Sequence, residues 1–206
     1  MKKSLILYVL ISGVLLPKVS AQADFQKDWR NFPVVVSLQF HAISMPFRNM
    51  GSNFKNFGIG IGTEVSHNSS QNWVQQFELV WFKNKASGNG IHLSTQAAWR
   101  PGFGSGVFGE LKAGIGYLIA KRPSDAWAMK EGQWEKLPQG RKGKLTIPVG
   151  IGGGYYSYSD KTFVSPFLGY QVLLVSKYNA SIPVMPQSLV QFGGRIHPNY
   201  SNNIID

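Results

Sequence analysis

The stretch Val34–Met45, with the sequence VVVSLQFHAISM, decides the fold class because polar and apolar side chains alternate along it. Apolar residues take the even positions from 34 to 42, and the polar residues between them are Ser37, Gln39 and His41. In an extended strand successive side chains point to opposite faces, so this alternation gives one apolar and one polar face. The stretch therefore predicts a β-strand that separates two different environments.

Seven further stretches repeat the alternation. They are Asn56–Ser66, Trp73–Lys83, Ile91–Arg100, Val107–Ile119, Lys144–Tyr155, Phe163–Val175 and Leu189–His197. Stretches of roughly 9 to 13 residues suit a tilted crossing of the hydrocarbon layer of a membrane. Pro148 and Pro166 interrupt two of them, and proline cannot donate a hydrogen bond to a neighbouring strand. We expect a bulge or a bend to accommodate each proline.

The connections between the eight stretches alternate between short and mostly longer ones. The short ones are 67–72, 101–105 and 156–161, and the others are 46–55, 84–90, 120–143 and 176–188. Strands of soluble β-sandwiches also alternate polar and apolar side chains, so alternation alone does not distinguish them from a membrane barrel. An even number of strands, aromatic residues near the ends of the apolar faces and this asymmetry of connections are instead typical of outer-membrane barrels. We therefore predict an all-β fold, an eight-stranded antiparallel up-and-down transmembrane β-barrel, over residues 24–206.

The composition excludes several other classes of protein. The 206-residue chain has 43% hydrophobic, 13% aromatic and only 15% charged residues, a balance that disordered chains do not show. It has no cysteine, which excludes disulfides, thiolate metal sites and cysteine nucleophiles. No apolar run reaches the ~18 residues that a membrane-spanning helix needs.

Residues 1–23 have the pattern of a secretory signal peptide. Lys2 and Lys3 precede the largely apolar stretch Ser4–Leu16, and the sequence AQA at 21–23 offers cleavage after its first or its last alanine. Cleavage removes Lys2, Lys3 and Lys18, so the formal charge falls from +11 to +8. We therefore expect an exported protein.

The alternating strands and the leader together resemble the small eight-stranded outer-membrane barrels of the OmpA-transmembrane and OmpX type. The sequences HAISMPF, GTEVSHN and SPFLGYQ are also similar to segments of uncharacterised barrel proteins of Bacteroidota. The resemblance implies a place in the bacterial outer membrane and no particular activity. Such barrels often end in an aromatic residue that the assembly machinery uses, whereas this chain ends HPNYSNNIID. Phe192 or Tyr200 would have to serve instead.

Lys83 and Lys144, at the ends of two stretches, count with the external connections, and all other charged residues of the predicted strands fall on the polar face, which we take as the inward face. They are Glu64, Glu78, Glu110, Arg100, Lys112 and Arg195. Acids and bases in equal number inside a narrow tube can pair, and the interior of eight strands is just wide enough for side chains to fill. We therefore predict a lumen plugged by a polar network of these six residues with His41 and His92. A narrow ion-conducting pore along the three glutamates is an alternative.

Basic residues gather in the longer connections, which outer-membrane barrels place outside the cell, and with Lys83 and Lys144 at their edges they leave a net charge of +9 there. Lysine and arginine at the rim can pair with lipid A phosphates, so lipopolysaccharide is the predicted partner. The long external loop 120–143 also holds aromatic residues that suit a protein interface, so docking on a larger outer-membrane transporter or secretion complex is a further hypothesis. The predicted binding residues are Lys121, Arg122, Trp127, Trp134, Arg141 and Lys142.

One constellation could carry chemistry. The sequence HNS at 67–69 is similar to the His-x-Ser pair of outer-membrane lipid A deacylases, and Glu78 could orient the histidine. The family pattern continues with asparagine, where this chain has Ser70, and HNSSQN is also ordinary turn composition. An acyl hydrolase that uses His67, Ser69 and Glu78 is thus the alternative to a non-enzymatic structural or interaction protein, which we predict. We expect no metal or cofactor, because inward histidines more often join a polar network, and no nucleic-acid partner for an exported chain.

Overall fold

The computed structural model describes residues 32–43, 51, 54, 56–68, 70–84, 88–121, 125–137, 140–156, 162–176 and 183–198. The predicted signal peptide, Ser69 and Arg122 lie outside these residues. Over the ranges described, no helix combines the length and the hydrophobicity that a bilayer crossing requires.

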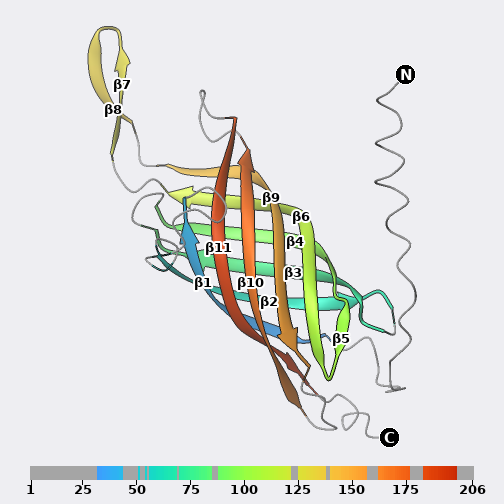
Figure 1. The fold of residues 1–206 in the computed structure, drawn as a ribbon. Coiled ribbons are helices and arrows are strands. Elements are labelled where there is room, and N and C mark those ends of the chain that lie inside the picture. Colours follow the sequence, from blue (N-terminus) through green and yellow to red (C-terminus); the bar gives the residue numbers. More distant parts are fainter. Residues whose placement is uncertain are drawn as a thin grey trace, which may run out of the picture.

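Eight long strands close into a barrel (Figure 1). They are β1 (Val34–Ala42), β2 (Phe57–Ser66), β3 (Trp73–Phe82), β4 (Gly90–Trp99), β6 (Val107–Lys121), β9 (Arg141–Tyr155), β10 (Phe163–Ser176) and β11 (Val184–His197). Each pairs antiparallel with its neighbour in chain order, and β1 pairs with β11 to close the ring. The predicted fold class is confirmed.

The barrel has two different ends. We call the end with the connections 67–72, 100–106 and 156–162 the turn end, and the opposite end the loop end. β1 starts and β11 finishes at the turn end, where Val34 pairs with Ile196. The short strand β5 (Gly102–Gly104) also lies there and pairs with the start of β6.

Prolines fit the barrel without a shift in register. Pro148 pairs with Leu173 and Pro166 with Gly194 in uninterrupted ladders, so of the bulge or bend that we expected, no bulge forms in these two pairings. At Pro148 the ladder between β6 and β9 instead omits two pairs and then resumes in the same register. β11 begins at Val184 and not at the predicted Leu189, because the stretch that contains Pro186 pairs with β10 only and extends past the end of β1.

The loop 120–143 contains a second sheet, which the sequence analysis did not predict. β7 (Ala126–Lys130) and β8 (Gln133–Leu137) form a hairpin that stands clear of the barrel at the loop end (Figure 1). Glu131 and Gly132 connect the strands with φ angles of 48° and 82°. Two successive positive φ angles define the type I′ turn that two-residue hairpins prefer.

The barrel is apolar outside and polar inside. Outward side chains such as Ile61 and Leu93 are more than half exposed, whereas inward glutamines such as Gln39 and Gln96 are fully buried. A soluble protein distributes its residues the other way round. This distribution is that of a barrel whose outer solvent is lipid.

Candidate functional site: the lumen and the loop-end rim

Four charged side chains from four parts of the ring meet near the turn end of the lumen. Glu64 comes from β2, Glu110 from β6 and Arg195 from β11, and Arg100 directly follows β4. All four are at least 96% buried. Each is the inward residue of its alternating strand, so strand geometry alone points all four at the barrel axis.

The four side chains form a closed set of charge-assisted hydrogen bonds. Arg100 donates to both oxygens of Glu64, at 2.5 and 2.7 Å, and through Nε to Glu110 Oε2 at 2.6 Å. Arg195 donates to Glu64 Oε1 at 2.8 Å and to Glu110 Oε2 at 2.6 Å. Every guanidinium thus contacts both carboxylates, and two positive charges balance two negative charges in the buried interior of the barrel.

Neighbouring side chains add further contacts to this ionic cluster, although Arg195 Nη1 is buried without a hydrogen-bond partner among the described residues. Gln76 donates to Glu64 at 2.9 Å and to Glu110 at 3.2 Å. The ring of Phe167 lies 4.2 Å from the Arg195 guanidinium carbon, a cation–π distance. The contacts surround the arginines with acceptors and ring faces, which offsets part of the cost of removing them from water.

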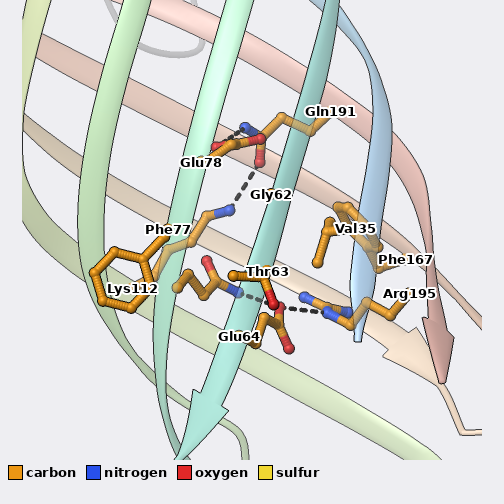
Figure 2. A pocket seen from close by; sticks show the side chains of 11 residues that line it. Val35, Gly62, Thr63, Glu64, Phe77, Glu78, Lys112, Phe167, Gln191 and Arg195 are labelled. Carbon is orange, nitrogen blue, oxygen red and sulfur yellow. Dashed lines mark hydrogen bonds and ion pairs between the residues drawn. The ribbon is translucent and has the colours of Figure 1, made fainter. Parts of the chain in front are cut away.

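A second polar layer continues from the ionic cluster toward the loop end (Figure 2). Lys112 lies 3.6 Å from Glu110 and donates to Gln191 at 2.8 Å. Gln191 donates in turn to Glu78 at 3.4 Å, and Gln39 donates to Glu78 at 2.6 Å. The six charged residues of the lumen therefore form one connected network of zero net charge. The cavity among them is about 10 Å³, close to the least volume that holds one water molecule.

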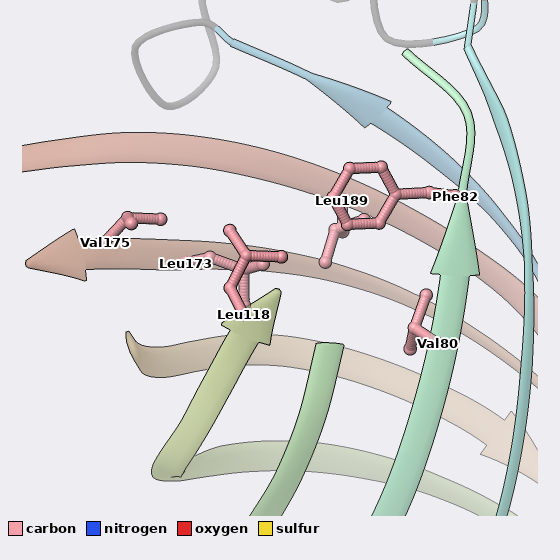
Figure 3. Packing of buried hydrophobic residues seen from close by; sticks show 6 residues of the cluster. All are labelled: Val80, Phe82, Leu118, Leu173, Val175 and Leu189. Atoms are coloured by element: carbon pink, nitrogen blue, oxygen red, sulfur yellow. The ribbon is translucent and has the colours of Figure 1, made fainter. Parts of the chain in front are cut away.

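Apolar side chains fill the lumen at the loop end, which the sequence analysis did not predict (Figure 3). The buried cluster consists of Val80, Phe82, Leu118, Leu173, Val175 and Leu189. These residues sit at inward positions of β3, β6, β10 and β11. The lumen is thus filled by two layers of different chemistry, one ionic and one apolar.

The apolar layer should contribute strongly to stability. We expect Leu173→Ala to lower the free energy of unfolding by about 2–5 kcal/mol, because it removes a fully buried side chain and leaves a cavity. Leu168→Ala on the outward face of the same strand is the matched control, since Leu168 is half exposed and its loss opens no internal cavity. Urea unfolding of both variants in lipid vesicles gives the comparison. Equal losses would show that the loop-end cluster is not packed.

His41 and His92 lie in the lumen but apart from the ionic network. His41 contacts Gln187 at 2.9 Å and Asn84 at 2.8 Å, and its ring stacks on Phe82 at 4.1 Å. His92 contacts Thr146 at 2.9 Å. The two histidines therefore pack beside the apolar layer. In the described part of the chain, no three His, Cys, Asp or Glu side chains are grouped so as to hold a metal ion.

His67 and Glu78, the two described residues of the alternative acyl hydrolase, are not brought together. His67 is exposed in the turn after β2, and its backbone N–H donates to Trp73 O at 2.8 Å. Glu78 lies five residues beyond Trp73 along β3 and faces the lumen. At the ordinary rise of a strand, Glu78 is therefore about 17 Å from the position of Trp73, next to which His67 lies. Its carboxylate is occupied by Gln39 and Gln191. The carboxylate therefore cannot orient the imidazole.

The basic residues at the rim divide between the two faces of one ribbon. β6 and β9 pair up to Lys121 opposite Arg141, two steps beyond the pair of outward Ile119 with Gly143. Cross-strand partners share a face, so Lys121 and Arg141 both point outward. Lys142 pairs with Ala120, two steps beyond the pair of inward Leu118 with Lys144, so Lys142 takes the inward side. The predicted binding residues thus separate into an outward pair and an inward lysine.

Trp127 and Trp134 lie on the hairpin and not on this ribbon. Trp127, Met129 and Trp134 share one face of the hairpin and are 57–65% exposed. They are separated along the chain from Lys121 and Arg141, so the structure does not gather the predicted binding residues into one patch.

Comparison with known proteins supports the fold and no closer relationship. No model of a protein family matches the sequence, and no curated protein matches it. The chain is similar in structure to Neisserial surface protein A (NspA), with a TM-score of 0.58 and 15% identity over 81% of this chain and 96% of that one. It is also similar to Ail, the attachment invasion locus protein of Yersinia pestis, with a TM-score of 0.51 and 12% identity over 82% and 99% of the two chains. At these identities the likeness is one of fold.

Proposed function

We propose that this chain is a non-enzymatic barrel of the bacterial outer membrane, exported by its signal peptide, with a closed lumen and a rim that holds lipopolysaccharide. The apolar outer surface supports the membrane location, and the filled lumen supports a structural or interaction role over transport. The observation that carries the proposed ligand is the outward pair Lys121 and Arg141.

Two like charges directly opposite each other on neighbouring strands are unfavourable unless an anion lies between them. No carboxylate within the described ranges forms an ion pair with Lys121 or Arg141. Lys121 lies two residues beyond Ile119 on β6, and Arg141 lies two residues beyond Gly143 on β9, so both lie at the loop-end edge of the outer surface. In the proposed membrane placement this edge lies at the depth of the lipid headgroups, where a phosphate can accept from the ammonium and the guanidinium together.

The test is the amount of lipopolysaccharide that co-purifies with the barrel from its own outer membrane in mild detergent. We expect the variant Lys121→Gln with Arg141→Gln to retain about tenfold less, because a lost charge-assisted interaction of about 1.4 kcal/mol changes binding tenfold. The control Lys142→Gln with Lys144→Gln removes the same charge from the other face and should retain the wild-type amount. An unchanged amount in the first variant, or an equal fall in both, would contradict the proposal.

A second proposal concerns the exposed hairpin. We infer that it docks the barrel on a larger outer-membrane complex, because three large apolar side chains on one face of a two-stranded sheet have no partner among the described residues. Exposed contiguous apolar surface marks interaction sites, and an isolated two-stranded hairpin is only marginally stable.

A further inference from the structure

The β7–β8 hairpin has two chemically different faces. Met129 is paired with Trp134 and Trp127 with Lys136, so the apolar side chains share one face. Lys130 is paired with Gln133 on the other face, where Lys130 also contacts Glu135 at 3.6 Å. One face thus carries the three large apolar side chains beside Lys136, and the other face is polar and ion-paired.

Charge divides between the hairpin and its base. Residues 125–137 contain Asp125, Glu131 and Glu135 against Lys130 and Lys136, a net charge of −1. The base at the ends of β6 and β9 instead holds only bases, namely Lys121, Arg141, Lys142 and Lys144. The ion pair of Lys136 with Asp125, at 2.5 Å, further neutralises the lysine beside Trp127. An anionic lipid surface would therefore attract the base and repel the hairpin.

We propose that the apolar face of the hairpin docks on a partner protein whose surface has an apolar groove with basic side chains at its edge. The proposal rests on the proposed outer-membrane location and names the chemistry of the docking partner. Trp127 and Trp134 enter the groove as rigid anchors, the residue type that most often dominates interface energetics. Glu131, exposed at the tip of the hairpin, faces the basic edge. Charge complementarity then sets the orientation and the association rate.

The experiment is photo-crosslinking in the intact outer membrane of the native bacterium. A photoreactive p-benzoylphenylalanine replaces Trp134 in one variant and Gln133 in the other. These neighbours occupy opposite faces of the same exposed strand, so they differ only in the face that they report. We expect one protein adduct of a single mass from position 134, at least fivefold stronger than from position 133. Adding Glu131→Lys should lower that adduct several-fold, because it opposes basic groups on the partner.

Several outcomes would overturn the inference. They are equal adducts from both positions, adducts with lipid or with a second copy of this chain, no adduct at all, or an adduct that Glu131→Lys leaves unchanged. Lipopolysaccharide co-purification is measured on the same membranes and depends on Lys121 and Arg141, not on the hairpin. A missing adduct with normal lipopolysaccharide therefore rejects the docking site alone, whereas a loss of both questions the outer-membrane location.

Discussion

Glu64→Gln should lower the free energy of unfolding by about 3–5 kcal/mol, the largest effect that we expect from a single isosteric change. Glu64 accepts from both Arg100 and Arg195, and the change leaves two buried guanidinium groups with one carboxylate, that of Glu110. Water can solvate the uncompensated charge only poorly, because the cavity nearby has room for about one molecule. Urea unfolding in lipid vesicles measures the loss.

A second change should recover much of this stability. Adding Arg195→Met to Glu64→Gln restores neutrality, because one guanidinium and one carboxylate remain and Arg100 still donates to Glu110. The control is Glu135→Gln in the hairpin. The side chains of Glu135 and its ion-pair partner Lys130 are both more than half exposed, so this change should lower the free energy of unfolding by about 0–1 kcal/mol. A loss below about 1 kcal/mol for Glu64→Gln, similar to this control, would mean that water screens the lumen charges.

Val149→Arg should cost about 2–4 kcal/mol of stability in a bilayer, because Val149 is outward and central in β9 and the new charge would lie near the midplane. Ile119→Arg is the matched control. Ile119 is also outward but lies two residues below the rim lysine, where an arginine reaches the headgroups and should cost about 0–1 kcal/mol. Urea unfolding of both variants in lipid vesicles measures how the loss of stability depends on the depth of the arginine in the bilayer.

Equal costs at the two positions would contradict this placement of the membrane. If both substitutions lowered the free energy of unfolding by the same small amount in detergent and in lipid, these two side chains would not face hydrocarbon. The comparison therefore tests the outward surface separately from the lumen.

The strands were predictable because alternation is a local property of the chain. A period of two places Glu64, Glu110 and Arg195 on the inward face without knowledge of any partner. Their contacts were not predictable, since Glu64 and Arg195 are 131 residues apart and meet only through the stagger of the closed barrel. The odd or even position of a residue in its strand thus predicts whether its charge enters the lumen. The register between strands around the barrel decides which of these charges pair.

The apolar layer left a signal that the sequence analysis did not use. Alternation breaks down at the loop ends of several strands, for example in LVWF at 79–82 and VLLV at 172–175, where apolar residues occupy both faces. A strand with two apolar faces there must bury one of them inside the barrel. The hairpin left another signal, because AWAMK and QWEKL flank the dipeptide Glu131–Gly132, and a glycine after an acidic residue favours a two-residue turn.

The most direct test of a closed outer-membrane barrel is electrical recording from the folded protein in a planar bilayer. Insertion is verified in vesicles of the same lipid by quenching of Trp73 and Trp81 fluorescence with brominated chains, since both side chains are outward and exposed. We predict inserted protein without discrete conductance steps, because the ionic and apolar layers both fill the lumen. Reproducible single-channel steps from protein that passes the insertion check would contradict the closed lumen and favour a narrow ion-conducting pore.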